Sequence, residues 1–281
     1  MPYVTAGDGV QLAYQVWGRR DATPVLMIQG LGTDARGWAL QRGAFGRRHR
    51  CVAPDNRGTG RSERPEGPYD LFRMADDAVR VLDAEGIDRA HVVGASMGGV
   101  IAQIVGVLHP ERTRSLVLAC TACRHHQWRR ELFEEWADLV AERGMSSLTD
   151  DGLRWLVGGR VQRRFGPAIN LLARLLLQGS PEGFVAQVQA ILAMSDDMRD
   201  ELCGIVVPTL VITGTQDSLT PVGDAEELAE EIAGARLVLL SGAAHGLMAE
   251  APNAFNDAVL TFLDEVDAAA PSAEADVAAS A

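Results

Sequence analysis

A serine between two glycines, Gly94 and Gly98, is the strongest chemical signal in the chain. Residues 90–93 before Ser96 are mostly apolar and residues 99–108 after it are rich in apolar side chains, which predicts a buried strand followed by a packed helix. A serine at such a junction projects its hydroxyl out of the sheet, and small neighbours leave room for the sharp turn. We therefore predict that Ser96 is a nucleophile at an elbow between a strand and a helix.

A neutral serine is a poor nucleophile, so a general base must take its proton and an acid must orient that base. His245 lies in a glycine-containing turn directly after an apolar run at 236–240, which predicts that it shares the edge of the sheet with Ser96. Asp217 follows the apolar run 209–213 in the same way. The position after the run that ends at residue 119 is the alternative place for the acid, but it holds no carboxylate. We therefore predict a triad of Ser96, Asp217 and His245.

Acyl transfer also requires donors for the oxygen that becomes negative. The backbone N–H of Met97 would lie at the N-terminus of the predicted helix, and the N–H of Leu31 lies in a glycine-rich turn after the apolar run 25–28. We predict that these two groups form the oxyanion hole. Gln29 precedes the turn, and its polar side chain makes it a candidate contact for the substrate.

The elements that would position these groups alternate between apolar runs and amphipathic segments, which is typical of an α/β fold with a mostly parallel sheet covered on both faces. The first two strands are predicted to form a hairpin. The predicted strands are residues 4–6, 10–17, 25–28, 50–54, 90–93, 115–119, 209–213 and 236–240.

About ninety residues separate the sixth predicted strand from the seventh, which is too long for a loop. This segment contains helical runs at 171–176 and 184–192, so we predict a helical cap over residues 121–203 on a core of residues 1–120 and 204–267. Trp128 in this cap is a second candidate contact for the substrate, although apolar cap residues usually serve packing between helices. Residues 268–281 have little to bury and are predicted to be a disordered tail.

Taken together, these motifs resemble the α/β-hydrolase superfamily over about residues 3–266. The resemblance rests on Gly30-Leu31-Gly32, residues 55–62, the elbow, Asp217 with Pro221, and His245. Within the superfamily the pattern is similar to the esterase, enol-lactonase and aclacinomycin-type methylesterase branches and to cofactor-free haloperoxidase relatives. The resemblance implies the α/β-hydrolase fold, with an eight-stranded sheet and a helical cap inserted after the sixth strand.

The resemblance also implies hydrolysis of a small carboxylic ester or lactone through an acyl-enzyme, without a metal or organic cofactor. The apolar, tryptophan-bearing cap predicts a fairly hydrophobic substrate. A serine rather than an aspartate at the elbow argues against a haloalkane dehalogenase or an epoxide hydrolase. Many relatives have histidine where this chain has Gln29, so the polarity of the pocket is expected to differ. The alternatives are C–C bond hydrolysis, a perhydrolase or haloperoxidase-type activity on the same triad, and a ligand-binding receptor on a hydrolase scaffold.

The composition excludes several other functions. The formal charge of −12 in 281 residues argues against a nucleic-acid-binding surface. All 26 basic residues are arginine, and the absence of lysine excludes a lysine Schiff base, pyridoxal-phosphate attachment and a Walker lysine. Residues 1–5 show no secretory signal, and the uncharged stretch 90–108 is interpreted as buried core, so we expect a cytoplasmic protein without membrane association. The sequence does not indicate an oligomeric state.

The four cysteines include a C-x-x-C pair, Cys120 and Cys123, followed closely by His125 and His126. Redox chemistry or zinc binding is therefore an alternative for this segment. No second cluster with metal-ligand spacing completes a site in the sequence. We accordingly expect reduced thiols and no metal.

Overall fold

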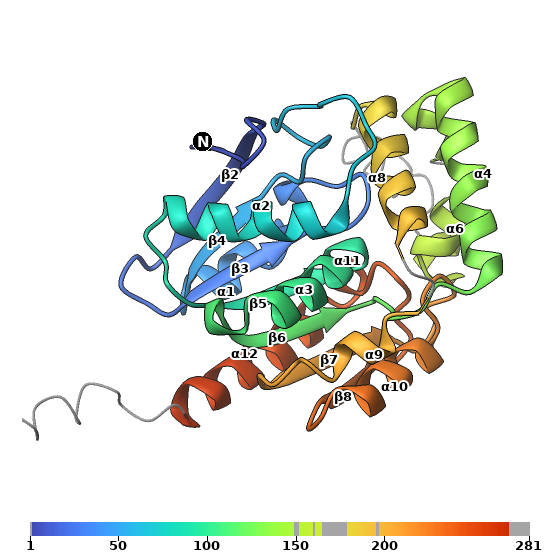
Figure 1. Cartoon of the computed structure of the whole chain (residues 1–281). Helices are drawn as coiled ribbons and strands as arrows, with labels where there is room; N and C mark the ends of the chain where they lie inside the picture. Colours follow the sequence, from blue (N-terminus) through green and yellow to red (C-terminus); the bar gives the residue numbers. More distant parts are fainter. Residues whose placement is uncertain (1, 149–151, 160, 165–178, 195–196, 270–281) are drawn as a thin grey trace, which may run out of the picture.

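The computed structural model describes residues 2–148, 152–159, 161–164, 179–194 and 197–269, which build an eight-stranded sheet with helices on both faces (Figure 1). The strand order is β1-β2-β4-β3-β5-β6-β7-β8. β1 and β2 form an antiparallel hairpin, β2 is antiparallel to β4, and the other neighbouring strands are parallel, which confirms the predicted mostly parallel sheet. The strands are β1 Tyr3–Thr5, β2 Gln11–Gly18, β3 Pro24–Ile28, β4 Arg50–Pro54, β5 Ala90–Ala95, β6 Thr113–Ala119, β7 Thr209–Gly214 and β8 Arg236–Leu240.

The central strands are apolar on both faces because both faces are covered by helices. In β3, Leu26 and Ile28 belong to the core beneath α2 and α3, whereas Val25 and Met27 face the core beneath α1 and α12. All four side chains are fully buried. The helices outside the β6–β7 connection are α1 Arg42–Gly46, α2 Leu71–Ala84, α3 Met97–Leu108, α10 Val222–Glu231, α11 Leu247–Glu250 and α12 Pro252–Ala269.

The connection between β6 and β7 contains the helices of residues 121–203, the segment predicted as a cap and here called the cap. Figure 1 shows α4, α6 and α8 gathered at one end of the sheet, with α4 and α8 side by side. The predicted helical run 184–192 lies within α8, whereas the run 171–176 lies outside the described residues. The elements are α4 Gln127–Arg143, η3 Met145–Ser147, α6 Leu153–Leu156, α8 Pro181–Ala193 and α9 Arg199–Leu202.

The last helix extends into the segment that the sequence predicts to be a tail. α12 continues to Ala269, so residues 268 and 269 belong to a helix. The reason is a tertiary contact, since the carboxylate of Asp267 accepts a hydrogen bond from Arg114 and contacts the buried His91 ring at 3.1 Å. The remaining tail, residues 270–281, lies outside the described part of the chain.

None of the described helices is long and apolar enough to cross a bilayer.

Candidate active site

Ser96 sits in a strained turn between β5 and α3. Its backbone has φ 54° and ψ −120°, in the left-handed region that non-glycine residues rarely adopt. A Cβ at Gly94 would lie 2.1 Å from the carbonyl oxygen of Gly98, and a Cβ at Gly98 would lie 2.2 Å from the carbonyl oxygen of Ile28. Both positions therefore require glycine, as the elbow interpretation of the sequence predicts.

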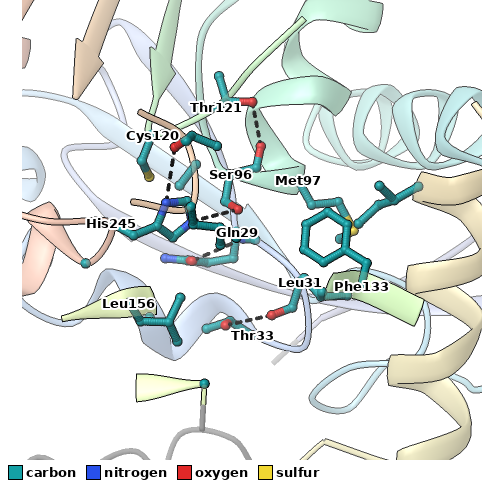
Figure 2. Close-up of a pocket in the computed structure, with 18 of the residues that line it drawn as sticks. Gln29, Leu31, Thr33, Ser96, Met97, Cys120, Thr121, Phe133, Leu156 and His245 are labelled. Atoms are coloured by element: carbon teal, nitrogen blue, oxygen red, sulfur yellow. Dashed lines mark hydrogen bonds between the residues drawn. The ribbon is translucent and has the colours of Figure 1, made fainter. Parts of the chain in front are cut away.

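The elbow brings the hydroxyl of Ser96 to the histidine that the sequence singles out. The Oγ of Ser96 lies 3.0 Å from Nε2 of His245 (Figure 2), and Nδ1 of the same ring lies 2.9 Å from Oδ2 of Asp217. The three residues follow β5, β8 and β7 respectively. The carboxyl ends of parallel strands meet at the same edge of a sheet, and this common edge brings the three side chains together.

Asp217 is buried and makes contacts through both of its oxygens. Oδ1 accepts the backbone N–H groups of Leu219 and Thr220 at 3.0 and 2.9 Å. Oδ2 accepts the hydroxyl of Thr220 at 2.8 Å in addition to its contact with His245. Burial by itself would raise the pKa of Asp217, but the charge and hydrogen bond of His245 and the bonds from Thr220 outweigh it and lower the pKa below its usual range. The carboxyl is therefore held as an anion.

Two threonines that the sequence interpretation missed belong to this network. The hydroxyl of Thr220 also lies 3.2 Å from Nδ1 of His245, and the hydroxyl of Thr121 donates to the carbonyl oxygen of Ser96 at 2.8 Å. Thr220 lies three residues after Asp217, a spacing typical of a turn closed by an aspartate, and this was the signal available in the sequence. Thr121 has no comparable local signal.

The two predicted oxyanion donors face the same space as Ser96. Met97 is the first residue of α3, so its N–H has no acceptor within the helix, and Leu31 follows β3 in the adjacent loop. Neither N–H donates to an acceptor among the residues that the structure describes. Figure 2 shows Leu31 and Met97 on the side of Ser96 that faces away from His245. Both groups are thus available to an oxygen bound beside Ser96.

Residues 29–32 after β3 carry the predicted donor Leu31 and are here called the oxyanion loop. Hydrogen bonds from the cap and from the neighbouring loop hold this segment in place. Gly32 has φ +68°, and its N–H donates to Oε1 of Gln187 in α8 at 2.9 Å. The amide nitrogen of Gln187 in turn donates to the carbonyl oxygen of Arg57 at 2.8 Å. Asn56 donates from Nδ2 to the carbonyl oxygen of Gln29 at 2.9 Å. The loop shape therefore depends on residues far away in the sequence.

A cavity of about 290 Å³ opens above Ser96 between the sheet edge and the cap. Gln29, Ser96 and His245 lie in its wall with a few other polar groups, and the rest of the wall is apolar. Arg129 reaches the wall as a buried cation paired with Asp224. The cap residues in the wall are Thr121, Ala122, His125, Arg129, Phe133, Trp136, Leu148, Gly152, Leu153, Leu156, Val157, Phe184 and Ile191.

Trp128, the second predicted substrate contact, lies outside the wall of this cavity. Its ring stacks on Trp155 with centroids 5.9 Å apart, its side chain is partly exposed, and it lines a separate surface cleft with Asp224 rather than the cavity above Ser96. The next residue, Arg129, points to the cavity instead, because the two residues leave α4 in different directions. The sequence could not distinguish these neighbours, since only the packing of α4 decides which face meets the sheet.

The C-x-x-C pair lies near the site but has the wrong environment for thiolate chemistry. Both thiols are buried, and burial raises the pKa of Cys123 to about 12 and the pKa of Cys120 well above its usual value, with the negative charge of Asp217 acting in the same direction on Cys120. Within the described residues, no group of three or more histidine, cysteine and acidic side chains has the arrangement of a metal site.

Comparison with known proteins agrees with the fold. The family model described as "alpha/beta hydrolase fold" matches residues 23–180, and one described as "TAP-like protein" matches residues 194–274. The chain is 33% identical over 257 residues to 3-oxoadipate enol-lactonase 2 of Acinetobacter baylyi, covering 91% of this chain and 94% of that protein. It is 32% identical over 269 residues to RutD of Azorhizobium caulinodans, a proposed carbamate hydrolase, covering 95% of this chain and all of the relative.

Among solved structures, an enol-lactonase of Burkholderia xenovorans LB400 superposes with a TM-score of 0.87 at 33% identity, covering 94% of this chain and 100% of that one. The chain belongs to the alpha/beta hydrolase family. It is an enzyme of the hydrolase class.

Proposed function

We propose that the chain is a serine hydrolase that cleaves a carboxylic ester or lactone through an acyl-enzyme. The observation that carries this proposal is the continuous contact from Ser96 through His245 to Asp217, at 3.0 and 2.9 Å, below a mostly apolar cavity. The names of the relatives support it, since they include an enol-lactonase. A small and largely hydrophobic substrate suits the size and lining of the cavity.

In the first half of the reaction, Nε2 of His245 accepts the proton of Ser96 while Oγ attacks the carbonyl carbon. The carbonyl oxygen becomes negative and receives hydrogen bonds from the N–H groups of Leu31 and Met97. Each such donor contributes about 3 kcal/mol to stabilisation of the transition state. Asp217 keeps Nδ1 of His245 protonated and stabilises the imidazolium that forms. His245 then gives its proton to the leaving alkoxide, which departs as the alcohol.

In the second half, water takes the place of the alcohol. His245 removes a proton from the water, the resulting hydroxide attacks the acyl carbon, and the same two N–H groups stabilise the negative oxygen. Collapse of this intermediate returns the proton to Oγ of Ser96 and releases the carboxylic acid. With a lactone the alcohol and the acid leave as one molecule, because both belong to the same ring.

Substitution of the nucleophile tests the proposal. We expect Ser96→Ala to lower kcat for p-nitrophenyl butyrate by at least about 10⁴-fold and to abolish labelling by a fluorophosphonate probe. Ser146→Ala is the matched control, because Ser146 lies in the cap outside the cavity wall and this variant should keep both activities. Ester turnover that survives in Ser96→Ala would overturn the assignment.

The same experiment separates the alternative functions. A wild-type protein that neither reacts with the probe nor turns over any ester or lactone fits a receptor on a hydrolase scaffold. A panel of esters, lactones and ring-cleavage diketones compared by kcat/KM, with and without peroxide, distinguishes ester hydrolysis from C–C bond hydrolysis and perhydrolysis. The proposal expects esters or lactones to have the highest kcat/KM.

A further inference from the structure

Glu250 connects the cap with the loop that contains His245. It accepts one hydrogen bond from each of these two segments. Its Oε1 accepts the N–H of Ala244 at 3.2 Å, and its Oε2 accepts the N–H of Gly158 at 3.1 Å. Ala244 directly precedes His245, whereas Gly158 follows the cap helix α6. A single carboxylate at the end of α11 therefore holds two segments that are far apart in the sequence.

A third hydrogen bond strengthens the same junction on the other side of the histidine. The N–H of Gly246 donates to the carbonyl oxygen of Leu156 at 2.6 Å. Both chain neighbours of His245 are thus fixed, one by Glu250 and the other by the cap. Leu156 also lines the cavity and lies below Gln29 and His245 in Figure 2. The same contacts therefore determine the orientation of the His245 ring and the position of this part of the cavity wall.

The chemistry of the junction requires a carboxylate. Two N–H donors approach from different segments, so the side chain between them must present two acceptors, and glutamine presents only one together with a donor. Burial raises the pKa of Glu250, while the hydrogen bonds from Gly158 and Ala244 act against this shift and favour the anion. The packing is also tight, since a Cβ at Gly158 would lie 3.0 Å from Oε2.

We propose that Glu250 is a positioning residue, which holds His245 in line with Ser96 and holds the cap wall at residues 156–158 closed over the cavity. The proposal rests on the proposed function, because Glu250 acts through His245 and touches no reacting atom. The proposal predicts two effects that can be measured separately. Loss of the Ala244 bond should reduce the rate of the chemical step, and loss of the Gly158 bond should weaken binding of substrates that reach the cap.

Kinetics with a short and a long ester separate these effects. In Glu250→Gln and Glu250→Ala we expect kcat for both p-nitrophenyl acetate and p-nitrophenyl hexanoate to fall by about tenfold, the effect of one lost hydrogen bond on the reacting geometry. KM should rise by about tenfold for the hexanoate and by less for the acetate, whose acyl group does not extend to the cap. The rate of fluorophosphonate labelling of Ser96 should fall with kcat.

Two further variants complete the experiment. Glu63→Gln is the matched control, because Glu63 also accepts a backbone N–H, from Gln11 at 2.7 Å, but lies outside the cavity wall, so its kinetics should equal those of the wild type. Gly158→Ala pushes a methyl group against Oε2 from the cap side and should raise KM for the hexanoate with less effect on kcat. This variant and the isosteric Glu250→Gln keep the test valid if Glu250→Ala fails to fold.

The result that would overturn the proposal is kcat and KM within twofold of the wild type for Glu250→Gln and Gly158→Ala, or a lowered melting temperature with unchanged kinetics in the folded protein. The latter outcome would mean that Glu250 stabilises the fold but does not position His245 for the reaction. Failure of the proposed function gives a different result, since the wild-type protein itself would then neither label at Ser96 nor hydrolyse either ester.

Discussion

At the scale of single residues, Asp217 combines two roles. Oδ1 closes a turn by accepting the N–H groups of Leu219 and Thr220, and Oδ2 contacts Nδ1 of His245. The turn fixes the carboxylate before any substrate arrives, so the histidine meets an oriented acceptor. A turn-capping aspartate and a partner of the histidine are therefore the same residue in this geometry.

This arrangement predicts the effect of replacing the carboxylate by an amide. Asp217→Asn should lower kcat for p-nitrophenyl butyrate by about 10⁴-fold, because the amide nitrogen favours the wrong tautomer of His245. The free energy of unfolding, measured with urea, should change little, since the remaining oxygen can still close the turn. Thr220→Val is the comparison and should lower kcat by about tenfold, as it removes one hydroxyl from the network. A kcat for Asp217→Asn within tenfold of the wild type contradicts the role assigned to Asp217.

At the scale of elements, the close approach of α3 to the ends of β3 and β5 places the serine. A side chain at residue 98 would clash with the strand. A Cβ added to Gly98 would lie 2.2 Å from the carbonyl oxygen of Ile28 and 2.7 Å from that of Gln29. These oxygens belong to the segment that leads into the oxyanion loop. The distance between the two predicted oxyanion donors, Leu31 and Met97, therefore depends on the absence of a side chain at residue 98.

We expect Gly98→Ala to lower the free energy of unfolding by about 1–3 kcal/mol, because the methyl group meets backbone atoms that can move only with the sheet. It should also reduce kcat, since α3 and the loop after β3 are forced apart. Gly223→Ala in α10 is the matched control, because nothing lies within 4 Å of the added Cβ, and it should stabilise the protein by about 0.5–1 kcal/mol. Urea unfolding curves measure both effects, and equal stabilities of the two variants would refute the argument.

Also at the scale of elements, two buried histidines, His49 and His91, lie between the sheet and the last helix. Nδ1 of His91 lies 2.7 Å from the hydroxyl of Ser115, and Nε2 lies 3.1 Å from Asp267 in α12. The ring of His49 is 6.0 Å away, edge to face. Burial lowers the pKa of both His49 and His91, and it outweighs the opposite effect of Asp267 on His91. Both rings are consequently neutral in the folded protein near pH 7.

These pKa shifts predict that stability decreases in mild acid. The histidines of the unfolded chain take up protons as the pH falls through about 6.5, whereas the folded protein resists protonation of His49 and His91. The free energy of unfolding should therefore be highest above pH 6.5 and fall as the pH is lowered toward 5. His91→Gln should make this decrease smaller. Urea unfolding at a series of pH values measures the slope, and an equal slope in wild type and His91→Gln would contradict the prediction.

At the scale of the whole molecule, burial divides the four cysteines into two kinds. Cys51, Cys120 and Cys123 are buried, and Cys203 is exposed. Burial raises the pKa of Cys51 to about 12, as it does for Cys123. Reaction of a thiol requires both access and ionisation, and the three buried groups lack both.

A thiol reagent therefore distinguishes the folded molecule from the unfolded one. We expect 5,5′-dithiobis(2-nitrobenzoate) to react rapidly with a single thiol in the native protein and with all four in denaturant. Cys203→Ser should remove the rapid reaction. Rapid reaction of two further thiols in the native state would revive a redox role for the C-x-x-C pair.

The amino-acid sequence by itself determined the sheet, its helices and the identity of the residues that meet at its edge. Apolar periodicity and turn residues are local signals, and the carboxyl ends of parallel strands necessarily share one edge, so Ser96, Asp217 and His245 could be placed together from their positions after strands. The requirement for glycine at residue 94 is equally local.

Only the tertiary structure decided which cap residues meet the site. Trp128 and Arg129 are neighbours in the sequence, yet Arg129 lines the cavity and Trp128 lines the outer surface. The bonds of Gln187 to the oxyanion loop and of Glu250 to Gly158 likewise join segments that no sequence motif relates. The physical reason is that a local pattern specifies an element and its apolar side, whereas the contacts between elements depend on how the entire chain packs.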